Sequence, residues 1–138
     1  WVTYCNDENG LVFESPVSKN VLSWWSDCYG EGPRFVYHAF AAIPEWAPPG
    51  ENHILYSEGV IKKVSYQDNN VEYTPTEIYG TEYLRLNFRP ASISLQGKKI
   101  PLRTNLAQEG FTIKELGSGD FAIVIKRLHQ GKVIIKSR

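Results

Sequence analysis

Apolar and polar residues alternate over most of the chain from Arg34 to the C-terminus, and a period of two is typical of half-buried β-strands. The alternation is cleanest at 82–88, where Leu84, Leu86 and Phe88 would share one face of a strand. Other short runs, rich in β-branched and aromatic residues, occupy 34–41, 53–57, 59–66, 71–74, 92–96, 111–113, 121–128 and 132–137. The pattern predicts about nine short strands, with the most apolar one, at 121–128, in the centre of its sheet.

Turn residues separate most of these runs. The sequence DNN at 68–70 is a strong hairpin signal, GK at 97–98 predicts a second turn, and QG at 130–131 predicts a terminal hairpin. Long helices do not alternate with the strands, and this excludes a parallel βαβ sheet. The predicted fold class is therefore all-β, an antiparallel β-sandwich of jelly-roll or immunoglobulin-like type.

The first fifty residues follow a different pattern. Ser15 and Pro16 suit the start of a helix, so one short helix is predicted over 16–28, with an irregular Trp-rich segment as the alternative. Prolines at 44, 48 and 49 exclude regular structure over 44–50, and one helical turn is expected within 104–110. We expect a single domain over 1–138, in which 1–50 is an elaboration of the regular strands of 51–138.

Composition narrows the classes of function. The chain has 138 residues, of which 15 are basic and 15 acidic, so its net charge is zero. A neutral chain is a poor match for a long nucleic-acid backbone, which requires a basic face. No apolar run approaches the ~20 residues of a membrane helix. We therefore expect neither a nucleic-acid partner nor a membrane span.

The two cysteines leave two interpretations open. Cys5 and Cys28 have 22 residues between them and could form one disulfide, which would stabilise the fold by about 3 kcal/mol in the chain-entropy model. The alternative is a pair of free, partly buried thiols. They are not arranged as CxxC, so the spacing does not indicate a zinc or redox site.

The tryptophans supply the strongest candidate chemistry, because all four lie within the first 46 residues. An indole face stacks on the C–H face of a sugar ring, and neighbouring carboxylates accept hydrogen bonds from its hydroxyls. The alternative is that the rings simply cover a sheet face, as buried aromatic residues often do. The candidate ligand-binding residues are Trp46, Trp24, Trp25, Tyr37, Asp27 and Glu45.

Catalysis and metal binding find less support. A pair of carboxylates from Glu14, Asp27, Glu31 and Glu45 could hydrolyse a glycoside only if the fold holds them about 5–10 Å apart. His38 offers a base, but the three histidines lack metal-ligand spacing. We predict no catalytic residues, no metal and no cofactor. A small hydrolase or lyase that uses Asp, Glu or His in a cleft is kept as an alternative.

The C-terminal half resembles a known class of domain. LQGK at 95–98 resembles a strand-ending turn, GF at 110–111 a strand start, and GD at 119–120 an acidic turn before the last strands. Over residues 82–136 these features resemble the C-terminal β-sandwich domains of bacterial polysaccharide-degrading enzymes. The resemblance implies a non-catalytic accessory domain of a secreted, periplasmic or cell-surface protein, whose partner is a polysaccharide or oligosaccharide. A purely structural domain that packs on an adjacent catalytic domain is the alternative.

Overall fold

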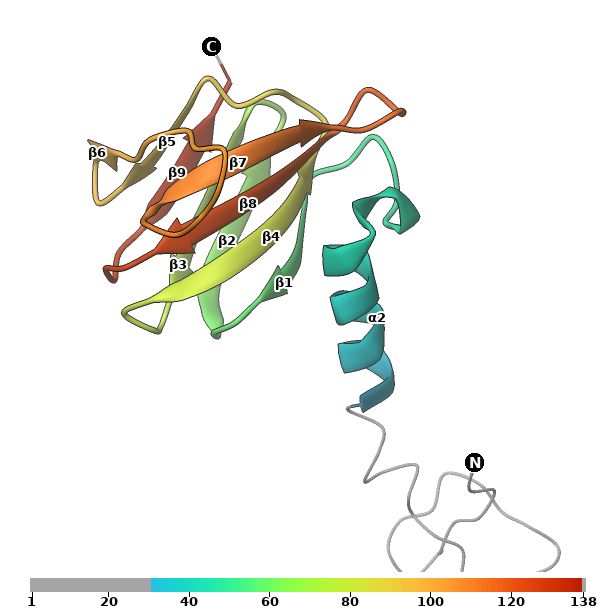
Figure 1. Ribbon diagram of the computed structural model, residues 1–138, viewed down its shortest axis with the longest axis horizontal. Coiled ribbons are helices and arrows are strands. Elements are labelled where there is room, and N and C mark those ends of the chain that lie inside the picture. Colours follow the sequence, from blue (N-terminus) through green and yellow to red (C-terminus); the bar gives the residue numbers. More distant parts are fainter. Residues whose placement is uncertain (1–30, 138) are drawn as a thin grey trace, which may run out of the picture. The chain divides into compact units, whose positions relative to one another are not determined.

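The computed structural model describes residues 31–137. The chain divides into two units, Trp1–Tyr37 and His38–Arg138, and helix α2 (Glu31–Ala42) crosses the boundary between them. The second unit contains a short 3-10 helix, η2 (Pro44–Trp46), followed by strands (Figure 1). The strands are β1 (His53–Ser57), β2 (Ile61–Gln67), β3 (Asn70–Pro75), β4 (Gly80–Leu86), β5 (Ser92–Leu95), β6 (Lys98–Lys99), β7 (Gly110–Glu115), β8 (Phe121–Arg127) and β9 (Val133–Lys136).

These strands form two sheets. One has four strands in the order β1-β4-β8-β7, and the other has five in the order β2-β3-β9-β5-β6. All of these strand pairs are antiparallel, so the predicted all-β antiparallel sandwich is confirmed. Strand β8 pairs with β4 on one side and β7 on the other, which confirms its predicted central place.

The core lies between the two sheets and follows the period of two. Leu84, Leu86 and Phe88 are all buried, as the alternation predicts. They belong to one cluster with inward side chains of both sheets, whose other buried members are Val71, Tyr73, Ile93, Leu95, Ile100, Phe111, Ile123, Ile125, Val133 and Ile135. Removal of this apolar surface from water is the main force that holds the two sheets together.

The turns follow the sequence closely. Residues 68 and 69 turn between β2 and β3, and residues 96 and 97 turn between β5 and β6. Gln96 has φ +52° and Gly97 has φ +81°, and two successive positive φ angles are typical of a type I′ hairpin turn. The hairpin signal at 68–70 is therefore confirmed, and the turn predicted at 97–98 lies one residue earlier, at 96–97.

The predicted terminal hairpin is wrong. Strand β9 pairs with β3 and β5 in the five-stranded sheet, whereas β8 belongs to the four-stranded sheet. The short connection after Arg127 carries the chain from the four-stranded sheet to the five-stranded sheet. β8 and β9 therefore bury their apolar side chains in the same core from opposite sides. A turn signal between two apolar strands cannot distinguish such a crossing from a hairpin.

The prediction of a strand over 34–41 is also wrong, because these residues lie in α2. A short apolar run with large side chains on both faces has no clear period, so it fits a helix as well as a buried strand. Alanines at 39, 41 and 42 favour the helix. The exclusion of regular structure from 44–50 is wrong at η2, where Pro44 occupies the first turn, as its fixed φ allows.

Two further expectations have different outcomes. Residues 104–109 form bends and not the expected helical turn. The helix predicted over 16–28 lies outside the described residues, and the single domain with an elaborated 1–50 stays a prediction. Among the residues that the structure describes, no helix is both long and apolar enough to cross a membrane.

Candidate functional site

A buried arginine fixes η2 against the four-stranded sheet. Arg85 lies between Leu84 and Leu86, so its side chain points to the outer face of that sheet, yet it is only 2% exposed. Its Nη1 donates to the carbonyl oxygens of Pro44, at 3.0 Å, and of Ala47. The Pro44 carbonyl also accepts the backbone N–H of Ala47 at 3.2 Å, so the guanidinium adds a second bond to this carbonyl and caps the carbonyl of Ala47.

Asp120 completes the attachment from the turn before β8. Arg85 Nε donates to Asp120 Oδ2 at 2.7 Å, and the backbone N–H of Gly50 donates to the same oxygen at 3.0 Å. Burial raises the pKa of Asp120, but the hydrogen bonds from Gly50 and Arg85 outweigh it and hold the pKa below its ordinary value. The segment from Pro44 to Gly50 is thus held at both ends by one buried ion pair.

Trp46 is the last residue of η2, and its side chain is 63% exposed. Its backbone N–H donates to the carbonyl of Ile43 at 3.0 Å, and the next residue, Ala47, is buried. The backbone on either side of Trp46 is therefore fixed while the indole faces water. We refer to Pro44–Ala47 as the Trp46 platform.

Glu45, the residue before Trp46, forms an ion pair with a lysine of the neighbouring sheet. Glu45 Oε1 accepts a bond of 2.8 Å from Nζ of Lys114, which projects from β7. This hydrogen bond lowers the pKa of Glu45, so the carboxylate is ionised at neutral pH. The platform thus presents an exposed indole from Trp46 and, from the preceding residue, a carboxylate that is paired with an ammonium group.

The structure places only part of the predicted site. Trp46 and Glu45 are neighbours on η2. Tyr37 lies in α2, but its side chain is not described. The other predicted residues lie outside the described residues, and they are Trp24, Trp25, Asp27, Cys5 and Cys28.

Of the residues considered for catalysis, the structure describes the side chains of His38 and Glu45, whereas Glu14 and Asp27 lie outside the described residues and the side chain of Glu31 is not described. The ring of His38 lies 4.4 Å from that of Tyr56, and Tyr56 lies 6.0 Å from Tyr83 on the neighbouring strand. Glu45 is occupied by Lys114. Within residues 31–137, no group of three or more His, Cys, Asp or Glu side chains is placed to hold a metal ion.

Three residues that build the platform were not anticipated from the sequence. Arg85 and Lys114 occupy strand positions of ordinary polar character, and Asp120 was seen only as part of a turn. The one available signal is the position of Arg85 in the middle of the strand that alternates most cleanly. An arginine at such a site suggests a partner above the sheet, but not which segment supplies it.

No family model, curated protein or solved structure matches this chain. The chemistry of the described residues is therefore the basis for assigning a function.

Proposed function

We propose that the chain is a non-catalytic carbohydrate-binding or accessory β-sandwich domain of a secreted or periplasmic glycan-active protein. The observation that carries the proposal is the Trp46 indole, 63% exposed on a backbone that is fixed by Arg85. The ligand is a polysaccharide or oligosaccharide with one sugar ring stacked on Trp46.

The chemistry of the platform suits this ligand. The C–H face of a pyranose packs on the indole face, while Glu45 accepts a hydroxyl hydrogen bond and Lys114 donates one. A tryptophan has few rotatable bonds, and its backbone is already held in place. Binding therefore costs little conformational entropy, which favours affinity for a small contact area.

The exposure of Trp46 also argues against a purely structural role within this unit. A ring that packs in a core is removed from water, and this is the main stabilising contribution of aromatic residues. Trp46 gains little of this stabilisation, although hydrogen bonds with Arg85 and Asp120 hold the segment around it. A ligand or partner that covers the indole would explain why a tryptophan is exposed on a fixed backbone.

Affinity electrophoresis of the chain through gels that contain soluble polysaccharides tests the proposal. We expect at least one polysaccharide to retard the wild-type chain and not to retard Trp46→Ala. Tyr79→Ala is the matched control, because Tyr79 is 73% exposed in the β3–β4 loop. Equal retardation of the wild type and Trp46→Ala by every polysaccharide would show that the platform is not the site.

A second candidate function rests on a different observation. Val60, Ile78 and Tyr79 are more than 60% exposed in the connections that follow β1 and β3. Contiguous exposed apolar side chains are typical of contacts between domains. In this alternative the domain packs on a catalytic neighbour in the same polypeptide. Hydrogen exchange at residues 76–79 would then be slower in the parent protein than in the isolated chain.

A further inference from the structure

The outward positions of the five-stranded sheet carry a regular grid of side chains, which are polar apart from Ile134. Val71 and Tyr73 point into the core, so Glu72 and Thr74 point outward. Their partners in register continue the same rows across the sheet: Lys63 is opposite Thr74, and Ser65 and Ile134 flank Glu72. The grid therefore follows directly from the strand pairing.

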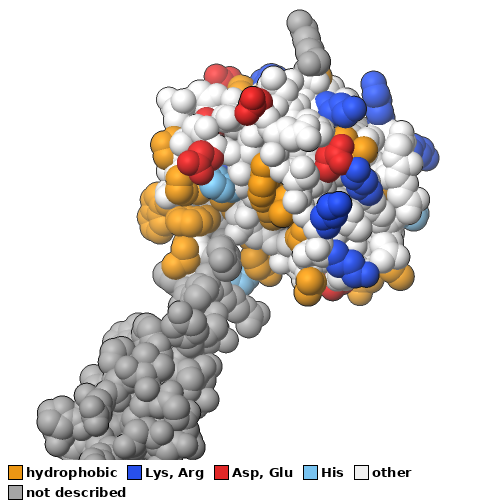
Figure 2. All heavy atoms as spheres, turned by 180° about the vertical axis from the view of Figure 1, so that it is seen from behind, with side chains coloured by type: hydrophobic (Ala, Val, Ile, Leu, Met, Phe, Trp, Pro, Cys, Tyr) orange, Lys and Arg blue, Asp and Glu red, His pale blue; other side chains and the backbone are white. Residues whose placement is uncertain are grey.

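The grid is strongly basic for a chain with no net charge. Its exposed lysines are Lys63, Lys99, Lys132 and Lys136, and Glu72 is the carboxylate on the outward positions of the described strands. Figure 2, which shows the molecule from behind, shows Lys and Arg side chains gathered on one side with few acidic ones among them. We call Lys63, Lys99, Lys132 and Lys136 the lysine face.

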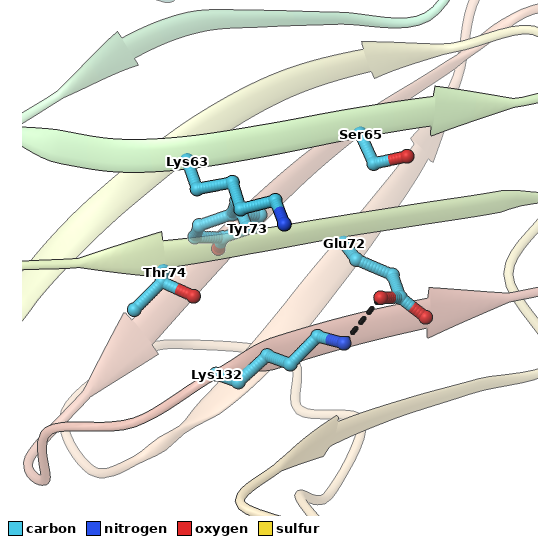
Figure 3. Close-up of a pocket in the computed structure, with 6 residues that line it drawn as sticks. All are labelled: Lys63, Ser65, Glu72, Tyr73, Thr74 and Lys132. Carbon is cyan, nitrogen blue, oxygen red and sulfur yellow. Dashed lines mark ion pairs between the residues drawn. The ribbon is translucent and has the colours of Figure 1, made fainter.

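A groove crosses this face at its centre. It has a volume of about 380 Å³ and is lined by Lys63, Ser65, Glu72, Tyr73, Thr74 and Lys132. Figure 3 shows Lys63 extending from β2 over β3, on the opposite side of the groove from Lys132. Two strand spacings separate these lysines, which is about 10 Å between their backbones.

The one carboxylate in the groove is already neutralised. Lys132 forms an ion pair with Glu72, and Asn70 Nδ2 donates to Glu72 Oε1 at 3.2 Å. The hydrogen bonds from Lys132 and Asn70 lower the pKa of Glu72. Within residues 31–137, no ion pair is formed by Lys63, Lys99 or Lys136. These three ammonium groups keep their charge available for a ligand.

The side chains between the lysines define the class of anion. Ser65, Thr74, Ser92 and Ser94 supply hydroxyls on outward positions, and these donate and accept hydrogen bonds. None of the outward positions is aromatic, so the face lacks the stacking platforms on which proteins hold single-stranded nucleic acid. Hydroxyls with spaced ammonium groups complement a ligand that carries both hydroxyls and repeated carboxylates.

We propose that the lysine face binds an acidic polysaccharide, with carboxylates of its uronate residues on Lys63, Lys99 and Lys136. This site lies on the outer face of the sheet opposite to that of the Trp46 platform, and it does not depend on the function proposed for Trp46.

The test measures binding of polygalacturonate by isothermal titration calorimetry. The variant replaces the three unpaired lysines, as Lys63→Gln, Lys99→Gln and Lys136→Gln together, and keeps the ion pair between Lys132 and Glu72. We expect its affinity to fall by at least about tenfold, because three attractions between ammonium groups and carboxylates are removed. Wild-type binding should weaken as salt rises, since exposed charges are screened. Lys98→Gln is the control, because Lys98 is opposite the inward-facing Leu95 and so lies on the other side of the strand.

Two other ligands test whether binding depends on the carboxylates and on the sugar backbone. Fully methyl-esterified polygalacturonate has the same backbone without charge and should bind at least tenfold more weakly. Single-stranded DNA tests whether any polyanion is accepted. Equal affinity for DNA, or full affinity in the triple variant, would overturn the proposal. Loss of polygalacturonate binding in Trp46→Ala would assign the acidic glycan to the platform, whereas loss only in the triple variant would support the lysine face even if Trp46 binds nothing.

Discussion

At the scale of single residues, the most consequential contact is a fully buried ion pair inside the sandwich. Arg127 Nη2 donates to Glu82 Oε1 at 2.7 Å, and both side chains have no exposed surface. Tyr73, from the opposite sheet, donates its hydroxyl to Glu82 Oε2 at 3.2 Å. Burial and the negative charge of Glu82 raise the pKa of Tyr73 well above its ordinary value, so it stays a donor. This cluster links the two sheets at one end of the core.

Replacement of Arg127 should therefore be severe. Arg127→Met would leave Glu82 buried without its partner, and the expected loss of unfolding free energy is about 3–5 kcal/mol. Glu82→Leu in the same chain removes the unpaired charge and should recover part of that loss. Recovery will be incomplete, because Arg127 Nη1 also donates to the carbonyls of Glu77 and His129. Urea unfolding of both single variants and the double variant measures this, and a double variant less stable than Arg127→Met would contradict it.

The second buried pair makes a prediction about pH. The pKa of Asp120 is lower in the folded chain than in the unfolded chain, so its contribution is present above the unfolded value of about 3.9 and is lost as the pH falls through the folded value. At pH 7 Asp120→Asn should cost about 2 kcal/mol, the size of a hydrogen bond to a charged group. The difference from the wild type should shrink below pH 4. A difference that is constant from pH 7 to pH 3 would contradict this.

At the scale of elements, the start of β7 depends on a close approach of two backbones. Gly110 has φ +155°, and a Cβ at this position would lie 2.7 Å from the carbonyl oxygen of Pro101. Phe111 donates its N–H to that carbonyl at 3.0 Å, so the two segments cannot separate without losing a bond.

Gly110→Ala should accordingly destabilise the fold by about 1–3 kcal/mol, the range for a residue held in a strained backbone conformation. Gly117→Ala is the matched control, because nothing lies within 4 Å of a Cβ built on Gly117 and its φ is not positive. Thermal unfolding of both variants provides the comparison. Equal melting temperatures for the two would show that the contact with Pro101 is not restrictive.

The elements also show what could be predicted from the sequence. Most strands between residues 53 and 136 follow from local alternation and turn chemistry, which do not depend on distant residues. The two-residue strand β6 was not predicted, because it has no apolar pattern of its own. The helix at 31–42 was missed because its apolar run has no clean period, and the β8–β9 crossing was missed because layer assignment depends on tertiary packing.

The candidate site depends even more on distant residues. The exposure of Trp46 depends on Arg85 and Asp120, which lie 39 and 74 positions further along the chain. Nothing in the local sequence of 44–50 shows that these two residues hold the segment. The lysine face could be inferred only once the register of β2, β3 and β9 was known.

At the scale of the whole described unit, the sandwich presents different chemistry on its two outer faces. The four-stranded sheet carries the Trp46 platform, and the five-stranded sheet carries the lysine face. The core between them is apolar except for the Glu82–Arg127 pair with Tyr73 at one end. A rigid scaffold that presents exposed functional groups on its surfaces is typical of binding domains.

The proposed stacking of a sugar ring on Trp46 can be observed by NMR. The ¹⁵N-labelled chain is titrated with an oligosaccharide from a polysaccharide that retards it in electrophoresis, and Trp46→Phe assigns the indole N–H resonance. We expect a saturable shift of the Trp46 indole resonance, together with shifts of the backbone amides of Glu45 and Lys114. A saturable titration in which the Trp46 indole and its neighbours do not move would contradict it.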